Sequence, residues 1–506
     1  MKVRDEFPIY AKVLAEQKPL RRSQFPISNL NMINLNKLDN RFYINHFKLF
    51  NSILIFFVIF IYIAVRDYNP YRMDDAWFTS FIYNDYVKNI ETDTVFGGDI
   101  TNGVGGTQLF GKIYTFIYGS LIQVFSDWTK QNFYFISTLF VLLSSFVWYK
   151  ILVSLKIEPR YAIIICLSVL YIDVFFSAAH CVRVEAFILF LLSMSFMLAL
   201  AKKYEWSIFF SLIAVETHPV GAASFFMNIP LIFDKEHRTF IFNHLKKIAI
   251  RVSLVIIAFG MLYVILHYDY LSRIWELRNA SAHNSLQDNF LYRFYFETLY
   301  YRHLPELILI VISIYLYIKR GLYKNRAIIL HCLISMLIFS LLLGRGRFSY
   351  TVLIYPAFVL FIFYTFISLN RLSLLISLIL VFYTPQYLFL SYKNRNVIDA
   401  QDYKNFINEE VRSNSSNSLP IVGLPNDYFA FISAEFYNLC YVDITSFNQK
   451  VKEAVMITHE VSELDKYYRG LPCDNLNNIN KNYSQQFIKT LKYMDESIII
   501  YKLSRK

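Results

Sequence analysis

The chain has 506 residues, of which 56% are hydrophobic and 18% aromatic, while only 17% are charged. This composition excludes an ordinary soluble globular protein, in which about a quarter of the residues are charged. The net charge of +12 does not indicate nucleic-acid binding, because the sequence has no basic patch interleaved with base-stacking aromatic residues.

The first 45 residues are polar and basic, and they contain no short apolar segment followed by a small-residue cleavage site. We therefore predict a cytoplasmic tail over residues 1–45 rather than a signal peptide. The richness in Ile, Asn, Lys and Phe is typical of an AT-rich, bacterial genome. A multi-pass protein of the bacterial inner (plasma) membrane is the expected setting.

Apolar runs of the length needed to cross a bilayer recur from residue 46 to residue 392. They predict an all-α polytopic region with about eleven membrane-spanning helices. The predicted spans are 46–66, 132–153, 160–178, 185–201, 206–219, 221–234, 247–267, 304–318, 327–343, 348–367 and 372–391.

The apolar stretch Thr107–Phe125 is ambiguous, because counting it as a span reverses the side of every later segment. Loop charge favours placing it along the outer interface, since basic residues collect in cytoplasmic loops. The side of the N-terminal tail then holds Lys150, Lys156, Arg160, Lys202, Lys203, Lys235, Arg238, Lys246, Lys247, Lys319, Arg320, Lys324, Arg326 and Arg371. The opposite short loops hold only Arg183, Arg345 and Arg347. This topology puts the loops 67–131 and 268–303 and the segment 393–506 outside.

Polar residues at the ends of the apolar segments collect on this outer side. They are Asp74, Asp75, His180, Arg183, Glu185, Glu216, His218, Arg345 and Arg347. A charge at bilayer depth costs about 2.5 to 3.5 kcal/mol on insertion scales, so such groups normally face a wet cavity or one another. We expect one outward-facing polar cavity that gathers them.

Each group also has a purely structural interpretation. The two aspartates suit a solvated helix N-terminus, and Arg183 with Glu185 suits an interfacial ion pair. His218 precedes a proline and suits a helix break, while Arg345 and Arg347 suit membrane anchoring by snorkelling.

The C-terminal segment 393–506 is polar and Asn-rich, which predicts a small α/β extracytoplasmic domain. Its predicted strands are "LPIVGL", "CYVDIT" and "ESIIIYKL", and "AQDYKNFINEEV" is a predicted helix. An acceptor-binding or lid role and simple packing on the outer loop are both open. Cys440 and Cys473 could pair in an oxidising compartment, whereas Cys166, Cys181 and Cys332 are interpreted as small buried hydrophobes.

The order of these features resembles the GT-C membrane glycosyltransferases, in particular the protein O-mannosyltransferases and lipid A aminoarabinose transferases of the glycosyltransferase family 39 type. The resemblance covers residues 46–367. Its motifs are the acidic "MDDAWF", the interfacial "GTQLFGKIYTFIYG", the turn "CVRVEAF", "THPVG" and the late "GRGRFSYTVLIYPAF". His218 departs from the pattern, because relatives often carry Lys at this position.

The resemblance implies transfer of a sugar from a polyprenyl phosphate to a glycan, lipid or protein acceptor at the outer face. It implies Asp74 as the catalytic base with Asp75 in support, and Arg183, Lys112, His218, Arg345 and Arg347 as candidate ligands of the donor phosphate. His180, Glu185 and Glu216 are expected to support the site. No cofactor is implied with certainty, although metal use varies among such enzymes and a divalent ion on Asp74 and Asp75 stays open.

Two other classes of protein remain in competition. A lipid-linked sugar transporter or flippase would also have many spans and buried charges, but an internal repeat typical of transporters is not evident. A polysaccharide polymerase or ligase would also use lipid-linked sugars and tends to place key arginines in a large outer loop. The segment Tyr270–His303 could serve in that way.

Overall fold

The computed structural model describes eight positions between 52 and 62, and then the ranges 73–89, 111–125, 127–267, 304–322, 327–342, 351–394, 419–432, 435–439, 447–448, 450–459, 475–493 and 496–506. All of them belong to one compact unit, Lys48–Lys506. The predicted tail 1–45, the predicted loop 268–303, Arg345, Arg347, Cys440 and Cys473 lie outside the described residues.

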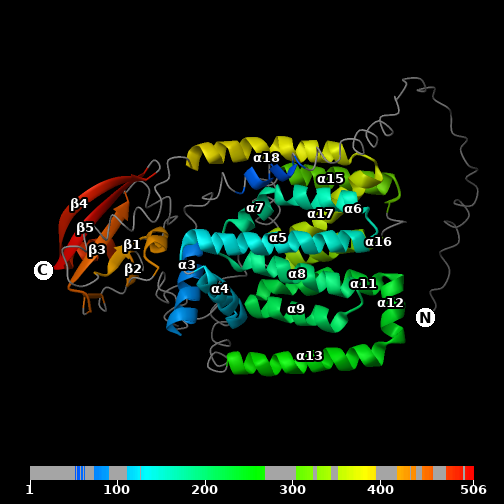
Figure 1. Cartoon of the computed structure of the whole chain (residues 1–506), viewed down its shortest axis with the longest axis horizontal. Coiled ribbons are helices and arrows are strands. Elements are labelled where there is room, and N and C mark those ends of the chain that lie inside the picture. Colours follow the sequence, from blue (N-terminus) through cyan, green and yellow to red (C-terminus); the bar gives the residue numbers. More distant parts are fainter. Residues whose placement is uncertain are drawn as a thin grey trace, which may run out of the picture. The chain divides into compact units, whose positions relative to one another are not determined.

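Long apolar helices run alongside one another in a bundle (Figure 1). They are α5 (Lys130–Ser154), α6 (Pro159–Leu170), α8 (Val184–Leu200), α9 (Tyr204–Thr217), α13 (Leu245–Leu266), α15 (Leu304–Lys319), α16 (Ala327–Leu342), α17 (Thr351–Ser368) and α18 (Leu372–Asn394). Each coincides with a predicted span. Among the described residues, three single helices are long and apolar enough to cross a membrane, at Lys130–Ser154, Leu245–Leu266 and Leu372–Phe389. The number of spans therefore stays a prediction.

Helix α8 forms the centre of the bundle, where it packs against α5, α9, α10 (Ala223–Asn228) and α17. Most of its side chains are buried and none is exposed. Helix α13 is the opposite case, because Phe259 is its only buried side chain. An apolar helix whose side chains are mostly exposed can face lipid, because its backbone N–H and C=O groups are hydrogen-bonded within the helix.

Two predicted spans are interrupted. The span predicted at 160–178 consists of α6 and α7 (Asp173–Ala179), which meet at a bend of 67°. The span predicted at 221–234 is divided into the 3-10 helix η3 (Pro219–Ala222), α10 and α11 (Pro230–Phe233). Proline opens both η3 and α11, as expected of a residue that lacks the N–H needed to continue a preceding helix.

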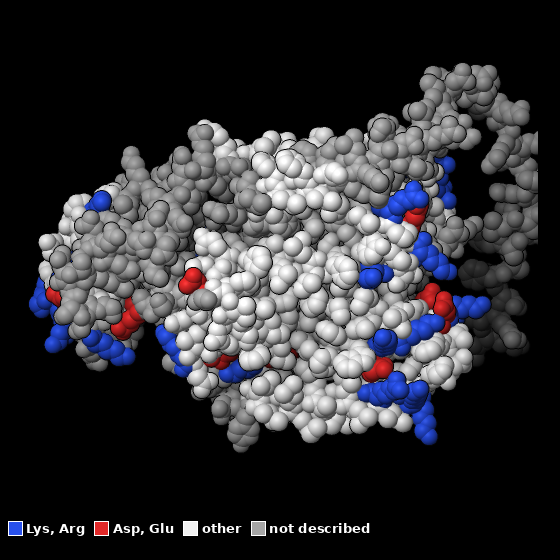
Figure 2. Space-filling model, in the orientation of Figure 1, with Lys and Arg blue, Asp and Glu red and all other residues white. Residues whose placement is uncertain are grey.

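The two ends of the bundle differ in charge. One end of the bundle is marked by the short helix α12 (Lys235–Asn243). Helices α5 and α8 end there, and α6, α9 and α13 begin there. Figure 2 shows Lys and Arg side chains gathered over this end. Ion pairs there join Lys202 to Glu236 at 2.8 Å and Arg251 to Glu205 at 3.1 Å. The arrangement agrees with the loop-charge pattern; which end faces the cytoplasm stays a prediction.

The opposite end of the bundle carries α3 (Met73–Tyr83), the π-helix η1 (Asn84–Lys88) and α4 (Lys112–Val124) (Figure 1). Helix α4 packs against α3, α5 and α9. Its 13 residues span roughly 20 Å. This is shorter than a hydrocarbon core of about 30 Å. That the stretch lies at the interface stays a prediction.

A five-stranded sheet of order β2-β1-β3-β5-β4 follows the bundle in the chain. Its strands are β1 (Ile421–Gly423), β2 (Phe436–Asn438), β3 (Glu453–His459), β4 (Tyr483–Tyr493) and β5 (Glu496–Arg505). β1 pairs in parallel with β2 and β3, and β5 pairs antiparallel with β3 and β4. The described residues of this part also form the 3-10 helix η8 (Pro425–Ala430) and the helix α22 (Asn475–Asn482).

The sheet confirms the predicted strands in "LPIVGL" and "ESIIIYKL". The predicted strand "CYVDIT" and the predicted helix "AQDYKNFINEEV" lie outside the described residues. The chain is thus mainly helical with a small α/β part near its C-terminus; the side of the membrane on which that part lies stays a prediction.

Candidate active site

The buried side chain of Asp75 connects α3 to α5 and to the turn before α8. Its side chain lies in the first turn of α3 and is only 1% exposed. Its Oδ1 accepts a hydrogen bond from the backbone N–H of Val182 at 3.0 Å, and its Oδ2 accepts one from the hydroxyl of Tyr134 at 3.1 Å. The carboxylate therefore fixes α3 to α5 and to the turn before α8. The side chain of Asp74 lies outside the described ones, while its backbone is part of α3.

Arg183 and Glu185 form a buried ion pair at the start of α8. The Arg183 Nε lies 3.0 and 3.2 Å from the two carboxylate oxygens of Glu185, and its Nη2 lies 2.9 Å from Oε1. The carbon of the guanidinium lies 5.4 Å from the ring centroid of Phe78 on α3. The interfacial ion pair considered from the sequence is thus present, and it contacts the helix that bears the two aspartates.

Tyr114 on α4 places a phenol beside these carboxylates. It is fully buried, and no described residue makes a hydrogen bond to its hydroxyl. Burial raises the pKa of Tyr114 well above its usual value, and nearby Tyr118, Glu185 and Asp75 raise it further. The hydroxyl stays protonated at neutral pH, so it is a neutral donor close to two acidic side chains.

Glu216 holds the N-terminus of α4. The residue lies in the last turn of α9, and its Oε1 accepts the backbone N–H of Ile113 at 3.3 Å and contacts the Nε2 of His267 at 3.0 Å. The backbone N–H of Gly111 donates to the carbonyl of Thr217 at 3.0 Å. A carboxylate is favourable here, because the first turn of a helix carries partial positive charge.

Gly111 is required by this close approach. A Cβ at residue 111 would lie 2.1 Å from the Oε2 of Glu216 and 2.4 Å from its backbone oxygen. No described residue donates a hydrogen bond to that Oε2. Only glycine lets the chain pass this closely, so Gly111 and Glu216 form a matched pair.

Lys112 forms an ion pair with Asp85. Its Nζ lies 2.8 Å from the Oδ1 of Asp85 on η1, and the hydroxyl of Thr115 donates to the Oδ2 of the same residue. Lys112 is 19% exposed, which leaves it partly accessible. The first turn of α4 is thus tied to both η1 and α9.

The two candidate histidines occupy structural positions. His180 is buried, with Nδ1 2.9 Å from the carbonyl of Phe176 and Nε2 3.4 Å from that of Tyr62. His218 is the N-cap of η3, where its Nδ1 accepts the backbone N–H of Val220 at 3.2 Å. This agrees with the helix-break interpretation, and a role toward phosphate for His218 stays a prediction.

The structure brings Asp75, Arg183, Glu185, Glu216 and Lys112 together in two clusters, and His180 and His218 belong to neither. Asp75, Arg183 and Glu185 form the first, and Glu216 with Lys112 forms the second, at the start of α4. Sequence reasoning missed Asp85, Tyr114, Tyr134 and His267. A signal existed for His267, which is a polar residue at the outer end of a predicted span. Tyr114 and Tyr134 gave none, because aromatic residues at membrane interfaces are common.

A divalent ion on Asp74 and Asp75 stays a prediction, because the side chain of Asp74 lies outside the described ones. Both oxygens of Asp75 already accept hydrogen bonds from the protein. The described residues contain no group of three or more His, Cys, Asp or Glu side chains that could hold a metal.

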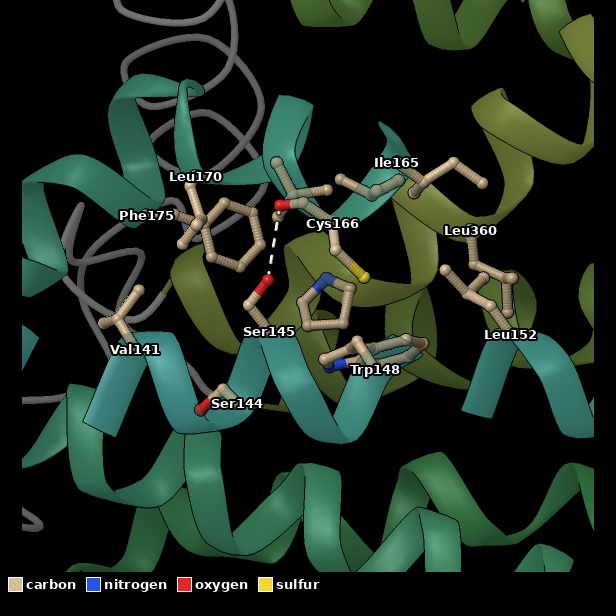
Figure 3. A pocket seen from close by; sticks show the side chains of 13 residues that line it. Val141, Ser144, Ser145, Trp148, Leu152, Ile165, Cys166, Leu170, Phe175 and Leu360 are labelled. Atoms are coloured by element: carbon tan, nitrogen blue, oxygen red, sulfur yellow. Dashed lines mark hydrogen bonds between the residues drawn. The ribbon is translucent and has the colours of Figure 1, made fainter. Parts of the chain in front are cut away.

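A separate apolar cavity lies within the bundle (Figure 3). It is lined by residues of α5, α6, α7 and α17. Figure 3 shows the hydroxyl of Ser145 donating a hydrogen bond to the carbonyl of Cys166. Its lining contains no charged side chain. The cavity is distinct from both polar clusters. Cys166, Cys181 and Cys332 are buried, which confirms their interpretation as small buried hydrophobes.

No protein-family model and no curated protein sequence matches the chain. Among solved structures, ArnT from Cupriavidus metallidurans in the apo state matches with a TM-score of 0.53 and 11% identity, over 88% of this chain and 97% of ArnT. AglB, an oligosaccharyltransferase from Archaeoglobus fulgidus in complex with an inhibitory peptide and a dolichol-phosphate, matches with a TM-score of 0.46 and 12% identity, over 87% of this chain and 73% of AglB.

The likeness to ArnT shows the fold of the chain. It extends over 88% of this chain and 97% of ArnT. The fold is the GT-C fold, which confirms the resemblance inferred from the sequence motifs.

Proposed function

We propose that the chain is an integral membrane glycosyltransferase that moves a sugar from a polyprenyl phosphate donor to a glycan, lipid or protein acceptor at the outer face of the membrane. The GT-C fold and the cluster of buried acidic and basic groups at one end of the bundle support this proposal. A lipid phosphate and an acceptor would meet at this site.

The reaction is substitution at the anomeric carbon. A hydroxyl or amine of the acceptor attacks that carbon, the bond between the carbon and the phosphate oxygen breaks, and the lipid phosphate leaves with the electron pair. Asp74 takes the proton of the attacking group. A carboxylate in this place also stabilises positive charge on the sugar ring in the transition state.

The leaving phosphate is an anion and needs cationic partners. Arg183 is the first candidate, because its guanidinium contacts α3, the helix that carries Asp74 and Asp75. Lys112 is the second candidate and is partly exposed beside Asp85. Arg345, Arg347 and His218 complete the proposed set, the first two from outside the described residues.

The hydrogen bonds of Asp75 are the observation that carries the proposal. They hold α3 against the turn that leads into Arg183, so the proposed base and the proposed phosphate ligand share one neighbourhood. Asp75 thereby supports the site without touching the substrate. A lipid flippase would have no need to hold an acidic pair beside a buried arginine in this way.

The direct test follows the fate of a polyprenyl phosphate sugar with the label in the sugar. Purified protein in lipid nanodiscs should release the label from the lipid and, with a suitable acceptor fraction, transfer it. A transporter would move the intact lipid-linked sugar between leaflets of proteoliposomes without cleaving it, and that result would refute the proposal. A polymerase or ligase would release label only when a lipid-linked chain is supplied.

A further inference from the structure

A lysine at the start of α5 joins the bundle to the C-terminal domain, the part of the chain that contains η8 and the five-stranded sheet. The Nζ of Lys130 lies 5.2 Å from the ring centroid of Tyr134 and 5.5 Å from that of Phe429 in η8. Tyr134 belongs to the bundle, whereas Phe429 follows strand β1. One cation thus contacts two aromatic faces from different parts of the chain, an arrangement that is electrostatically attractive for both.

The tyrosine in this contact also holds the acidic helix. Its hydroxyl donates to the Oδ2 of Asp75 at 3.1 Å, and both side chains are buried. The other oxygen of Asp75 accepts the N–H of Val182. Continuous contacts therefore run from Phe429 through Lys130 and Tyr134 to Asp75.

The segment η8 makes a second connection, because it packs directly against α3. Its shape is fixed locally: the carboxylate of Asp427 accepts the N–H of Leu424 at 2.8 Å, and a Cβ at Gly423 would lie 2.9 Å from the same carboxylate. In open α/β sheets, the space beyond the carboxyl ends of parallel strands is usually the ligand site. Here the segment that follows β1 contacts α3.

We propose that the C-terminal domain positions the acidic helix α3, with Lys130 and Tyr134 as positioning residues that hold Asp75 and, through α3, Asp74. The inference rests on the proposed function for the importance of Asp74. It replaces the two open roles of this domain, acceptor binding and simple packing, with a defined one. Small displacements of a reacting group lower the rate of the chemical step more than they weaken binding, so the effect should fall on kcat.

The test compares matched variants of the full-length protein in nanodiscs. Lys130→Met and Phe429→Leu each remove one part of the cation–aromatic contact, and Tyr134→Phe removes the hydroxyl that binds Asp75. Lys150→Met is the control for the first, because the Nζ of Lys150 also lies near two rings, Phe146 and Tyr149, at the other end of the same helix. Tyr387→Phe is the control for the last, because it removes a buried hydroxyl that donates to the carbonyl of Tyr171.

Two readouts are needed, one of them independent of activity. We expect kcat for sugar transfer to fall roughly threefold to tenfold in Lys130→Met and Phe429→Leu, and roughly tenfold or more in Tyr134→Phe, with KM for the donor changed less than about twofold. Hydrogen exchange of the backbone amides of α3 should become faster in all three, while that of α9 stays unchanged. Lys130→Arg should restore both readouts, because a guanidinium also stacks on aromatic rings.

The outcomes separate this inference from the proposed function. Unchanged exchange of α3 in Lys130→Met and Phe429→Leu overturns the inference, whatever the activity. Faster exchange with unchanged kcat also overturns it, because α3 would then need no positioning. If the parent protein transfers no sugar, the proposed function fails, and the exchange of α3 alone decides whether this domain holds the helix.

Discussion

The carboxylate of Asp75 accepts a hydrogen bond from the backbone N–H of Val182 at 3.0 Å, although 107 residues separate them in the sequence. Because the donor belongs to the backbone, the link depends on the side chain at residue 75 alone. It joins the acidic helix α3 to the turn before Arg183, in addition to the contact of Arg183 with Phe78.

Replacement of Asp75 should therefore reduce stability as well as activity. Asp75→Ala leaves the hydroxyl of Tyr134 and the N–H of Val182 without this acceptor, and each such loss costs about 1–3 kcal/mol when the group is buried. Asp75→Asn keeps one acceptor oxygen and should cost less. The measurement is the midpoint of thermal unfolding in detergent; equal midpoints for Asp75→Ala and the parent would contradict the anchoring role.

The buried pair of Arg183 and Glu185 calls for a double substitution. Arg183→Ala should weaken donor use severely and Arg183→Lys should recover part of it, but removal of Arg183 also leaves the buried Glu185 unpaired, at a cost of about 3–5 kcal/mol. Replacing both residues by Met removes the pair together and should restore most of the stability. If Arg183 binds phosphate, the double variant stays unable to bind donor; normal donor binding would make Arg183 a structural residue only.

Gly111 gives a test of the close contact between the N-terminus of α4 and Glu216. A Cβ at this residue would meet both the side chain and the backbone oxygen of Glu216, so a side-chain rotation alone cannot relieve the clash. We expect Gly111→Ala to destabilise the protein by about 1–3 kcal/mol and to reduce transfer. Gly260→Ala is the control, because no atom lies within 4 Å of a Cβ there. Similar thermal midpoints for Gly111→Ala and the parent would contradict the close contact between Gly111 and Glu216.

The predicted topology can be tested by labelling with an impermeant maleimide. Ser484→Cys in β4 and Lys203→Cys between α8 and α9 both place a thiol at an exposed position. In cells with a permeabilised outer barrier, we expect labelling of Ser484→Cys above the parent and none of Lys203→Cys until the inner membrane is opened. The reverse pattern would place the acidic helix on the cytoplasmic side.

Much of the fold follows from local sequence properties. Apolar length located the helices of the bundle, and the loop charges matched the basic end near α12. The bend of 67° between α6 and α7 was missed, because Tyr171 and Ile172, where the chain turns, carry no Gly or Pro signal. Buried Asp173, which accepts a hydrogen bond from Gln386 at 3.3 Å, begins the second piece.

The contact of Arg183 with Glu185 was anticipated from the sequence, but most other contacts of the candidate site were not. The position of the two aspartates after the first apolar run pointed to α3, and the turn with Arg183 and Glu185 lies beside it as expected. The partners Tyr134, Asp85 and His267 were not predictable, because each contact joins residues 27 to 59 positions apart. Such pairs depend on how helices cross, which a single sequence does not encode in any local pattern.

The most direct test of the account is the kinetics of Asp74→Asn. Asparagine keeps the size and polarity of the residue and caps a helix about as well, but it cannot take the proton of the acceptor. We predict that the rate of sugar transfer by the purified variant falls by about 100-fold or more while binding of the polyprenyl phosphate donor persists. Transfer at the rate of the parent protein would contradict the catalytic assignment, and loss of donor binding would move the role of Asp74 from proton transfer to donor binding.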